Sequence, residues 1–384
     1  MKTIAVITVG RSDYSIYLPI LRLIQVDSDL NLQIVAGGMH LSPEFGSTID
    51  VLTSDGFEIA ETVDMLLSSD TQEAMAKSVG IGIVGFAEVY GRLRPDMILV
   101  LGDRLEMHAA AVAAVPFNIP IAHVHGGEIT EGAIDDVLRH SMTKLSHLHF
   151  VSTIEYAKRV CQMGEESWRV IVSGSPSLDN LREIELWDFE ELTARFDLSF
   201  EIPPILVTYH PVTLQFADTA RQIAELLDSL KEYTNPILFT APNADPGGRE
   251  LAKTIKSFVE ERPQCHFVPN LGTKGYFSMM AHAGVMVGNS SSGIIEAASF
   301  GLPVVNIGER QRGRVRPANV IDVACDRVSI SSGIERGLSP EFKQSLKGLV
   351  NPYGQGRAAS VIVDGLKKFS SEILLAKRFV DANL

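Results

Sequence analysis

Short apolar runs recur along the first half of the chain, and each is followed by turn residues and then by a helical pattern. Their hydrophobic residues do not alternate with polar ones, which is typical of strands buried on both faces of a parallel sheet. The runs cover residues 4–9, 32–36, 97–101, 121–124 and 149–151. Helical patterns lie between them at residues 15–25, 106–114 and 133–145. This half of the chain therefore predicts a series of right-handed βαβ units.

A second series begins after an irregular stretch, residues 184–203, that is rich in Glu and Leu. Strands are predicted at residues 204–209, 236–241, 266–269, 285–287 and 304–307. Helices are predicted at residues 219–233, 249–261, 293–300 and 358–377. We expect an α/β fold with two doubly wound, Rossmann-like domains and a ligand cleft between the carboxyl ends of their strands. The expected limits are 1–180 for the N-terminal domain, 181–365 for the C-terminal domain, and 366–384 for a helix that returns to the N-terminal domain.

The composition and net charge of the chain indicate a globular protein and disfavour some classes of binding partner. The 384 residues are more than one core usually holds, and 45% hydrophobic with 21% charged residues suits a globular protein. The formal net charge is −13, which disfavours nucleic acid and anionic membranes as partners. An anionic ligand would need a concentrated positive pocket. The three cysteines are far apart without a CxxC pair, and we read neither a signal peptide nor a membrane span, so a reducing, cytoplasmic location is expected.

Familiar nucleotide motifs do not explain the chain. Gly80, Gly82 and Gly85 match G-x-G-x-x-G, but they follow a helical pattern instead of a strand, so helix packing is the better interpretation. The sequence has no GxxxxGK[ST] loop and no G-x-S-x-G elbow.

One stretch concentrates acid/base side chains. Residues 123–140 read HVHGGEITEGAIDDVLRH. His123, His125 and Glu128 have the spacing of three metal ligands, but no second His/Asp cluster is spaced to complete a hydrolase site. A metal-free acid/base site on a sugar uses the same residue types.

The second half contains a candidate anion site. A predicted strand runs into GNSSSG, and a helix is expected to begin near residue 294, so amide N–H groups and the hydroxyls of Ser290 and Ser291 suit a diphosphate. Simple helix capping is the alternative. Glu296 is placed to bind ribose hydroxyls or to act only as an acid that the helix dipole favours.

Further polar residues follow other predicted strands. Four arginines, among them Arg314, lie in the segment ERQRGRVR and suggest a diphosphate clamp. Arg11 in GRSDYS and the GDR turn hold equivalent positions in the first domain, and His210 in YHPVT does so in the second. Asn243 and Asp245 lie in PNADPGG, which is also an ordinary turn sequence.

Taken together, these motifs resemble the hydrolysing UDP-N-acetylglucosamine 2-epimerases of sialic-acid biosynthesis. The resemblance rests, from about residue 4 to residue 320, on GRSDYS, GDRLEMHA, HVHGGEITEGAIDDVLRH, YHPVT, PNADPGG and GNSSSGIIEAASFGLPVVNIGERQRGR. It implies a GT-B-like fold with a sugar nucleotide in the cleft, no metal, no other cofactor, and a homodimer through the first domain. The sugar would lie on the side of the N-terminal domain and UDP on the side of the C-terminal domain.

The resemblance also implies roles for matching positions. Asp103 and Asp135 resemble acids that act at the sugar ring, and His210 matches a histidine proposed to assist loss of the nucleotide. His40 resembles a residue near the sugar. Positions that match the uridine and diphosphate site are Arg11, Ser15, Arg104, Asn243, Ser290, Ser291, Glu296 and Arg314, and we add Arg139 and Asp245 as further binding candidates.

One departure from the family pattern affects the chemistry. Many relatives carry glutamate where this chain has His125, so the acid/base role there falls to His125 or to Glu128. The HxHGGE variant resembles the branch that acts on UDP-2,4-diacetamido-2,4,6-trideoxyglucose in legionaminic acid synthesis. Two closely related sugars are therefore both candidate substrates.

The expected mechanism follows from the substrate's chemistry. No carbonyl acidifies the C2 hydrogen of an N-acetylhexosamine, so loss of UDP from C1 has to make that proton acidic. Elimination would give a 2-acetamidoglucal, and hydration with protonation on the opposite face would give N-acetylmannosamine and UDP. Two faces need two acid/base groups. A GT-B glycosyltransferase is the alternative from another class, and it would require an acceptor.

Overall fold

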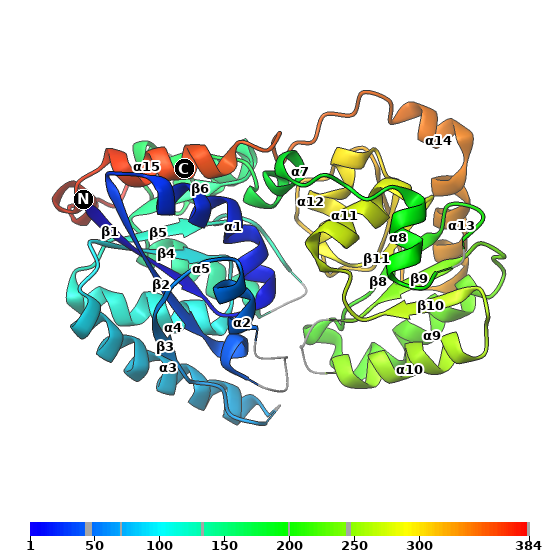
Figure 1. Ribbon diagram of the computed structural model, residues 1–384, viewed down its shortest axis with the longest axis horizontal. Coiled ribbons are helices and arrows are strands. Elements are labelled where there is room, and N and C mark those ends of the chain that lie inside the picture. Colours follow the sequence, from blue (N-terminus) through cyan, green and yellow to red (C-terminus); the bar gives the residue numbers. More distant parts are fainter. Residues whose placement is uncertain (43–47, 70, 132–133, 199, 243–246, 382–384) are drawn as a thin grey trace. The chain divides into compact units, whose positions relative to one another are not determined.

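The computed structural model describes residues 1–384 apart from residues 43–47, 70, 132–133, 199, 243–246 and 382–384. The chain divides into two compact units (Figure 1). The first unit comprises Met1–Glu128, Asp135–Asn180 and Tyr353–Leu384, and the second comprises Ile129–Ile134 and Leu181–Pro352. No helix in the described part of the chain combines the length and hydropathy needed to cross a lipid bilayer.

The first unit is built on a parallel sheet that has seven strands among the described residues, in the order β3-β2-β1-β4-β5-β6-β7. The order reverses beside β1, which pairs with both β2 and β4, and this reversal is the mark of a doubly wound sheet. The strands are β1 (Lys2–Thr8), β2 (Leu30–Gly37), β3 (Ile59–Val63), β4 (Met97–Leu101), β5 (Ile121–Val124), β6 (Leu148–Val151) and β7 (Val170–Val172).

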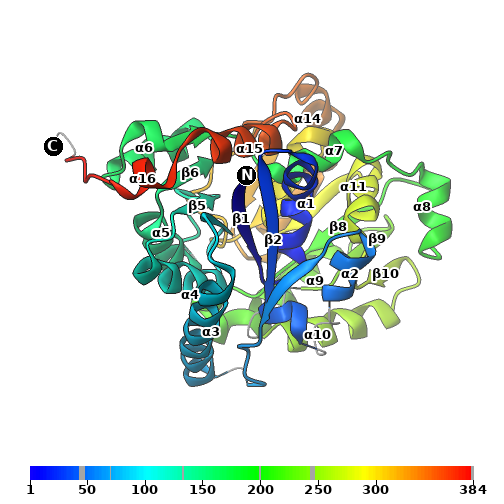
Figure 2. The ribbon, with the colours of Figure 1, turned by 60° about the vertical axis from the view of Figure 1, so that its left-hand side comes forward.

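Helices cover both faces of this sheet. Helices α1 and α15 pack together on one face, and α3 packs with α4 on the other (Figures 1 and 2). The helices of this unit are α1 (Arg11–Val26), α2 (Ile49–Ser54), α3 (Gln72–Leu93), α4 (Leu105–Ala114), α5 (Asp135–Leu145), α6 (Ile154–Gln162), α15 (Ala358–Lys368) and α16 (Ser371–Leu375). Short 3-10 helices are η1 (Gly38–Leu41), η3 (Val115–Phe117), η4 (Ser167–Arg169) and η5 (Pro176–Leu178), and α7 (Asn180–Glu183) spans the boundary between the units.

The G-x-G-x-x-G match lies inside α3. A Cβ on Gly82 would come 2.4 Å from Cε of Met65, and a Cβ on Gly85 would come 2.7 Å from Cγ1 of Val63. These glycines let the helix approach the β3 strand and the residues after it, which confirms the helix-packing interpretation.

The second unit repeats the plan with six described parallel strands in the order β10-β9-β8-β11-β12-β13. They are β8 (Ile205–Thr208), β9 (Ile237–Thr240), β10 (Cys265–Val268), β11 (Val285–Gly288), β12 (Val304–Ile307) and β13 (Val320–Val323). Its helices are α8 (Phe189–Arg195), η6 (Thr213–Asp218), α9 (Thr219–Leu230), α10 (Gly248–Glu260), α11 (Gly272–His282), α12 (Ser291–Ile295), η7 (Ala297–Phe300), α13 (Arg327–Leu338) and α14 (Pro340–Ser345). The α/β prediction of two doubly wound sheets is therefore confirmed.

The chain rejoins the first unit at Tyr353, although the sequence analysis places residues up to 365 in the second domain. The reason is a cap on α15. Both carboxylate oxygens of Asp179 accept backbone N–H groups at the start of that helix, from Ala358 at 2.9 Å and from Ala359 at 2.6 Å. The carboxylate thereby fastens the start of α15 to the segment 135–180 of the first unit.

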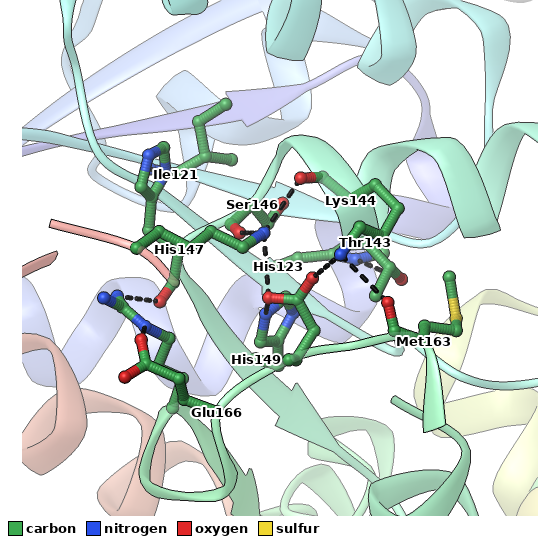
Figure 3. A network of polar contacts seen from close by, with 12 residues as sticks. Ile121, His123, Thr143, Lys144, Ser146, His147, His149, Met163 and Glu166 are labelled. Atoms are coloured by element: carbon green, nitrogen blue, oxygen red, sulfur yellow. Dashed lines mark hydrogen bonds and ion pairs between the residues drawn. The ribbon is translucent and has the colours of Figure 1, made fainter. Parts of the chain in front are cut away.

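A buried ion cluster holds the C-terminal residues against the same unit (Figure 3). Glu165 is 1% exposed, and its carboxylate contacts Nζ of Lys144 at 2.6 Å, Nζ of Lys377 at 2.8 Å and Nε2 of His149 at 3.1 Å. Lys377 also donates to the carbonyl of Ser146 at 2.6 Å. Burial opposes ionisation of Glu165, but the hydrogen bonds from these partners outweigh it and lower the pKa to about 2.

Replacing Glu165 with glutamine is expected to lower the free energy of unfolding by about 3 kcal/mol, because two cations are left without their buried partner. Because the pKa of Glu165 in the folded protein lies below the ordinary value of 4.5, the stabilisation is fully present above pH 4.5. It is lost as the pH falls towards about 2. Urea unfolding of the variant and the wild type between neutral and acidic pH measures the difference. Glu155→Gln on the exposed side of α6 is the control. A difference that does not shrink in acid would contradict the ion-cluster account.

Candidate active site

Polar residues gather at the carboxyl ends of β1, β2, β4 and β5 in the first unit. Parallel strands bring these ends to one edge of the sheet, where doubly wound proteins bind ligands. The residues are Arg11 and Ser15 in α1, His40 in η1, Asp103 and Arg104 after β4, and His125 and Glu128 after β5.

Arg139 of α5 joins two of the candidate acids. Its side chain is 3% exposed, its Nη2 forms an ion pair with Oδ2 of Asp103, and its Nη1 lies 3.5 Å from Oε2 of Glu128. A guanidinium presents its donors in a rigid fork, so one arginine fixes the positions of both carboxylates. Asp135, the other acid of the predicted set, is the first residue of the same helix.

Glu128 is held from the other side by a histidine and a serine. Its Oε1 lies 2.5 Å from Nδ1 of His125 and 2.6 Å from Oγ of Ser152. Ser152 directly follows β6, and sequence reasoning missed it. Its position after a buried strand is the signal that could have found it.

The glycine pair between His125 and Glu128 has a steric reason. Gly127 has φ +74°, and a Cβ there would lie 2.6 Å from the carbonyl oxygen of Tyr156. Arg159 of α6 donates to the Gly127 carbonyl, so the loop is fastened against that helix. His125 itself has φ +65°, a left-handed conformation that a non-glycine residue rarely adopts.

His123 hydrogen-bonds to Gly102 and Thr143. It is fully buried, its Nε2 donates to the carbonyl oxygen of Gly102 at 2.8 Å, and its Nδ1 lies 3.5 Å from Oγ1 of Thr143. Burial lowers the pKa of His123 to about 3, so the ring is neutral. His123 therefore supports the turn that carries Asp103. Among the residues with described positions, no group of three or more His, Cys, Asp or Glu side chains is arranged to hold a metal ion.

A second pair of acids lies near Arg104. Nε of Arg104 is 3.4 Å from Oδ1 of Asp13, and its Nη2 donates to Oγ of Ser12 at 3.3 Å. Burial raises the pKa of Asp13 although Arg104 opposes the shift, and burial likewise raises the pKa of Glu106 in α4. Sequence reasoning did not single out Asp13 or Glu106, because an acid in the first turn of a helix is common.

His40 and Ser15 are fixed by local hydrogen bonds. The ring nitrogens of His40 contact Oγ1 of Thr8 at 2.8 Å and Oγ1 of Thr48 at 2.7 Å, and burial lowers the pKa of His40 to about 4. Oγ of Ser15 donates to the carbonyl of Ser12 at 2.8 Å. Both residues lie on the expected edge of the sheet.

In the second unit, Asn289 ties the ends of β8 and β11 together. Its Oδ1 accepts from the backbone N–H of His210 at 2.7 Å, and its Nδ2 donates to the His210 carbonyl at 2.8 Å. Gly288 has φ +144°, and a Cβ there would lie 2.0 Å from the carbonyl oxygen of Thr208. Asn289 lies in the GNSSSG stretch that the sequence singles out, but the sequence assigns it no role of its own.

His210 is a neutral imidazole at this junction. Burial, and then the nearby Arg310, lower its pKa to about 3. The guanidinium of Arg310 donates to the carbonyl oxygen of Asn289 at 3.1 Å, and Nε2 of Gln311 donates to the same oxygen at 2.9 Å. The arginine segment therefore contacts the residue that directly precedes the serine run, through the carbonyl oxygen of Asn289.

Ser290 caps α12 as its N-terminal residue. Its Oγ accepts from the backbone N–H of Ser292 at 3.4 Å and lies 3.1 Å from Oγ of Ser292. Ser291 is the first residue of this helix, and Glu296 is the buried residue that ends it. Asn243 and Asp245 lie outside the described residues.

The arginine segment packs on residues 129–131, which belong to the second unit. Nη2 of Arg314 lies 3.5 Å from Oγ1 of Thr130, and Nε of Arg312 lies 3.0 Å from Oε2 of Glu131. A Cβ on Gly313 would come 2.5 Å from Cγ2 of Ile129. The arginines therefore already have protein partners, which a purely solvated loop would lack.

Comparisons with known proteins agree with this arrangement. The family model described as UDP-N-acetylglucosamine 2-epimerase matches residues 22–367. A Campylobacter jejuni protein named GDP/UDP-N,N'-diacetylbacillosamine 2-epimerase (hydrolyzing) is 37% identical over 383 residues, which are 99% of each chain. A Legionella pneumophila protein named UDP-N,N'-diacetylbacillosamine 2-epimerase (hydrolyzing) is 35% identical over 360 residues, 94% of each chain.

A solved structure shows the same fold. The UDP-GlcNAc 2-epimerase from Neisseria meningitidis, bound to UDP-GlcNAc, superposes with a TM-score of 0.83 at 20% identity, covering 96% of this chain and all of the other. The GT-B-like prediction is therefore confirmed. With the family model covering most of the sequence and two relatives aligned over nearly their whole length, the chain belongs to the UDP-N-acetylglucosamine 2-epimerase family.

Proposed function

We propose that this protein is a hydrolysing 2-epimerase that converts a UDP-activated 2-acetamido sugar to the free 2-epimer and UDP. The observation that carries the proposal is the array in which Arg139 holds Asp103 and Glu128, and Glu128 holds His125. Such an array supplies more than one proton-transfer group at one edge of the sheet, and epimerisation through an alkene requires this because the proton leaves one face and returns to the other.

UDP-N,N'-diacetylbacillosamine, which is UDP-2,4-diacetamido-2,4,6-trideoxyglucose, is the first candidate substrate. The name of the relative at 35% identity supports it, and the name of the relative at 37% identity includes it beside the GDP-linked sugar. The HxHGGE variant in this chain supports it as well. UDP-N-acetylglucosamine is the second candidate, because the family description names it. Both sugars have an acetamido group at C2 and a diphosphate at C1, so the same steps apply to both.

The first chemical step is loss of UDP together with the C2 proton. The electron pair of the C1–O bond leaves with the diphosphate, and the C2–H pair forms the C1=C2 double bond. Water then adds its oxygen to C1, and C2 receives a proton on the opposite face. We propose Asp103, Asp135 and the His125–Glu128 pair as the acid/base groups. Asp103 and the His125–Glu128 pair lie at one edge of the sheet in the first unit. Asp135 begins the helix that carries Arg139.

The second unit is proposed to bind UDP. Ser290, Ser291, Arg314 and Glu296 are its candidate contacts, and Arg310 adds positive charge beside the serine run. A neutral His210 donates one hydrogen bond from its ring, so it would stabilise the leaving phosphate as a donor without adding a formal charge. The positive charge has to come from the arginines.

The function is tested by a proton NMR time course in heavy water with each UDP sugar in separate samples and no acceptor. Release of UDP and a free 2-epimer that carries deuterium at C2 is the expected result. The sugar that turns over identifies the substrate. Turnover that appears only after an acceptor is added would indicate a glycosyltransferase instead, and loss of activity in EDTA would support the metal alternative. Light scattering of the same sample tests the homodimer that the resemblance implies.

Replacing Ser290 with alanine is expected to weaken UDP binding about 10-fold, because one hydrogen bond to a charged group is lost. Loss of the cap should also lower the free energy of unfolding of the second unit by about 1 kcal/mol. Calorimetric titration with UDP and urea unfolding measure the two effects, with Ser345→Ala on exposed α14 as the control. Lower stability with unchanged UDP affinity would mean that Ser290 acts only as a cap.

A further inference from the structure

The proton positions on His125 follow from its partner. A carboxylate only accepts hydrogen bonds, so the short 2.5 Å contact to Glu128 means that Nδ1 of His125 donates. In a neutral ring the other nitrogen, Nε2, then carries the lone pair. Oγ of Ser175 lies 3.5 Å from Nε2, which is long for a hydrogen bond. The ring therefore presents a base at Nε2.

Glu128 is poorly placed to be that base itself. Its Oε1 accepts from His125 and from Ser152, and its Oε2 faces Arg139. The glutamate side chain is 2% exposed, whereas that of His125 is 8% exposed. A proton taken up by Glu128 would displace one of these donors, while a proton taken up by His125 would strengthen the bond to Glu128.

The backbone around His125 is arranged to hold the ring in this pose. The His125 N–H donates to the carbonyl oxygen of Phe150 at 2.9 Å, and Ser152, two residues beyond Phe150, brings its hydroxyl to Glu128. The same two strand ends thus position both members of the pair. His125 keeps its side chain at φ +65°, where glycine or asparagine would be less strained, which points to a role for the imidazole.

We propose that His125 and Glu128 form a dyad in which Nε2 of His125 removes the C2 proton of the substrate. Glu128 and Ser152 are positioning residues that fix the ring and its tautomer. This inference rests on the proposed function and assigns the base within it. In the elimination the C2 proton moves to Nε2, the C2–H electron pair becomes the C1=C2 bond, and the C1–O pair leaves with UDP. The imidazolium then releases its proton to solvent, and a different group protonates C2 from the other face.

The dyad predicts a distinct ranking of variants. His125→Asn keeps a residue that tolerates the left-handed backbone but removes the base, so kcat should fall about 10³-fold with little change in KM. Glu128→Gln keeps an oxygen that accepts from His125 and Ser152, and should lose only about 10- to 100-fold. Ser152→Ala should lose about 10-fold. His282→Asn, on α11 of the second unit, is the matched control, and its kcat should be unchanged.

Chemical rescue separates a base from a structural residue. His125→Gly relieves the left-handed strain and leaves a space the size of the ring, so added imidazole should restore part of kcat, and substituted imidazoles should do so according to their basicity. A residue that only supports the loop would give no such dependence. ¹⁵N NMR of the wild type, with His125→Asn used for assignment, should show Nδ1 of His125 protonated and Nε2 unprotonated.

Different failures are distinguishable. A wild type that turns over neither UDP sugar would overturn the proposed function and the dyad with it. An active wild type with Glu128→Gln inactive and His125→Asn nearly unaffected would overturn the dyad alone, since Glu128 would then be the base. An Nε2–H tautomer of His125 in the resting enzyme would also overturn it.

Discussion

Replacing Asp103 with asparagine is expected to lower kcat by about 10²- to 10⁴-fold while UDP binding is retained. Asparagine has the same shape, and its side-chain oxygen still accepts from Arg139, so the loop after β4 should keep its position. It cannot exchange a proton with the sugar. Turnover is measured by UDP release with the sugar that the wild type uses, and UDP affinity by calorimetric titration.

The control for this variant is Asp64→Asn, which changes an exposed aspartate of the same unit. It should leave both kcat and UDP affinity unchanged. Full activity of Asp103→Asn would remove Asp103 from the chemistry and leave it only a structural partner of Arg139. Loss of UDP affinity together with turnover would instead point to a disturbed fold.

Replacing Arg139 with methionine is expected to abolish turnover and to lower the free energy of unfolding of the first unit by about 3–5 kcal/mol. The buried guanidinium is the shared partner of Asp103 and Glu128, so its removal takes away the cation that pairs with both carboxylates. Circular dichroism during urea unfolding measures the stability, and the UDP-release assay measures turnover below the unfolding transition.

Arg378→Met provides the matched comparison, because Arg378 is exposed and lies in the same unit. It should change stability by less than about 0.5 kcal/mol. A stable and active Arg139→Met protein would contradict the account of the site, since Asp103 and Glu128 would then hold their positions without it.

The strands that the sequence misses, β3, β7 and β13, lie at sheet edges, although the edge strand β10 is predicted. β1 and β4 are continuous apolar runs with buried centres, so their pattern is unambiguous. β3 alternates between partly buried and exposed residues, and β7 has three residues with none fully buried. Short edge strands of this kind carry little hydrophobic signal, because only one side of the strand is paired.

Two predicted helices are interrupted for local reasons. The stretch 293–300 divides into α12 and η7, and Gly301 ends the second with φ +59°. The stretch 358–377 divides into α15 and α16 because Ser370 caps the second helix by accepting from the N–H of Ile373. Helical periodicity continues through both breaks, so hydrophobic patterning alone does not reveal them.

The candidate site could be predicted by residue type but not by contact. Strand ends, glycine turns and clustered acids identify Asp103, His125 and Glu128 as one neighbourhood. That Arg139 bridges the acids, and that Ser152 reaches Glu128 from another strand, depends on the packing of α5 and β6 against β5. These residues are far apart in the sequence, so the sequence alone does not predict that they are in contact. Asn289 is hidden in the same way, because its partner is the backbone of His210.

The division of the chain also sets an order for biosynthesis. A chain made from its N-terminus usually completes its N-terminal domain first. Here the second unit has all of its sequence once Pro352 has been made, whereas the first unit still lacks α15 and Lys377. Until Lys377 emerges, the carboxylate of Glu165 lacks one of its ion-pair partners. The first unit begins synthesis before the second but is completed after it, because α15 and Lys377 belong to the domain that carries the proposed acid/base groups.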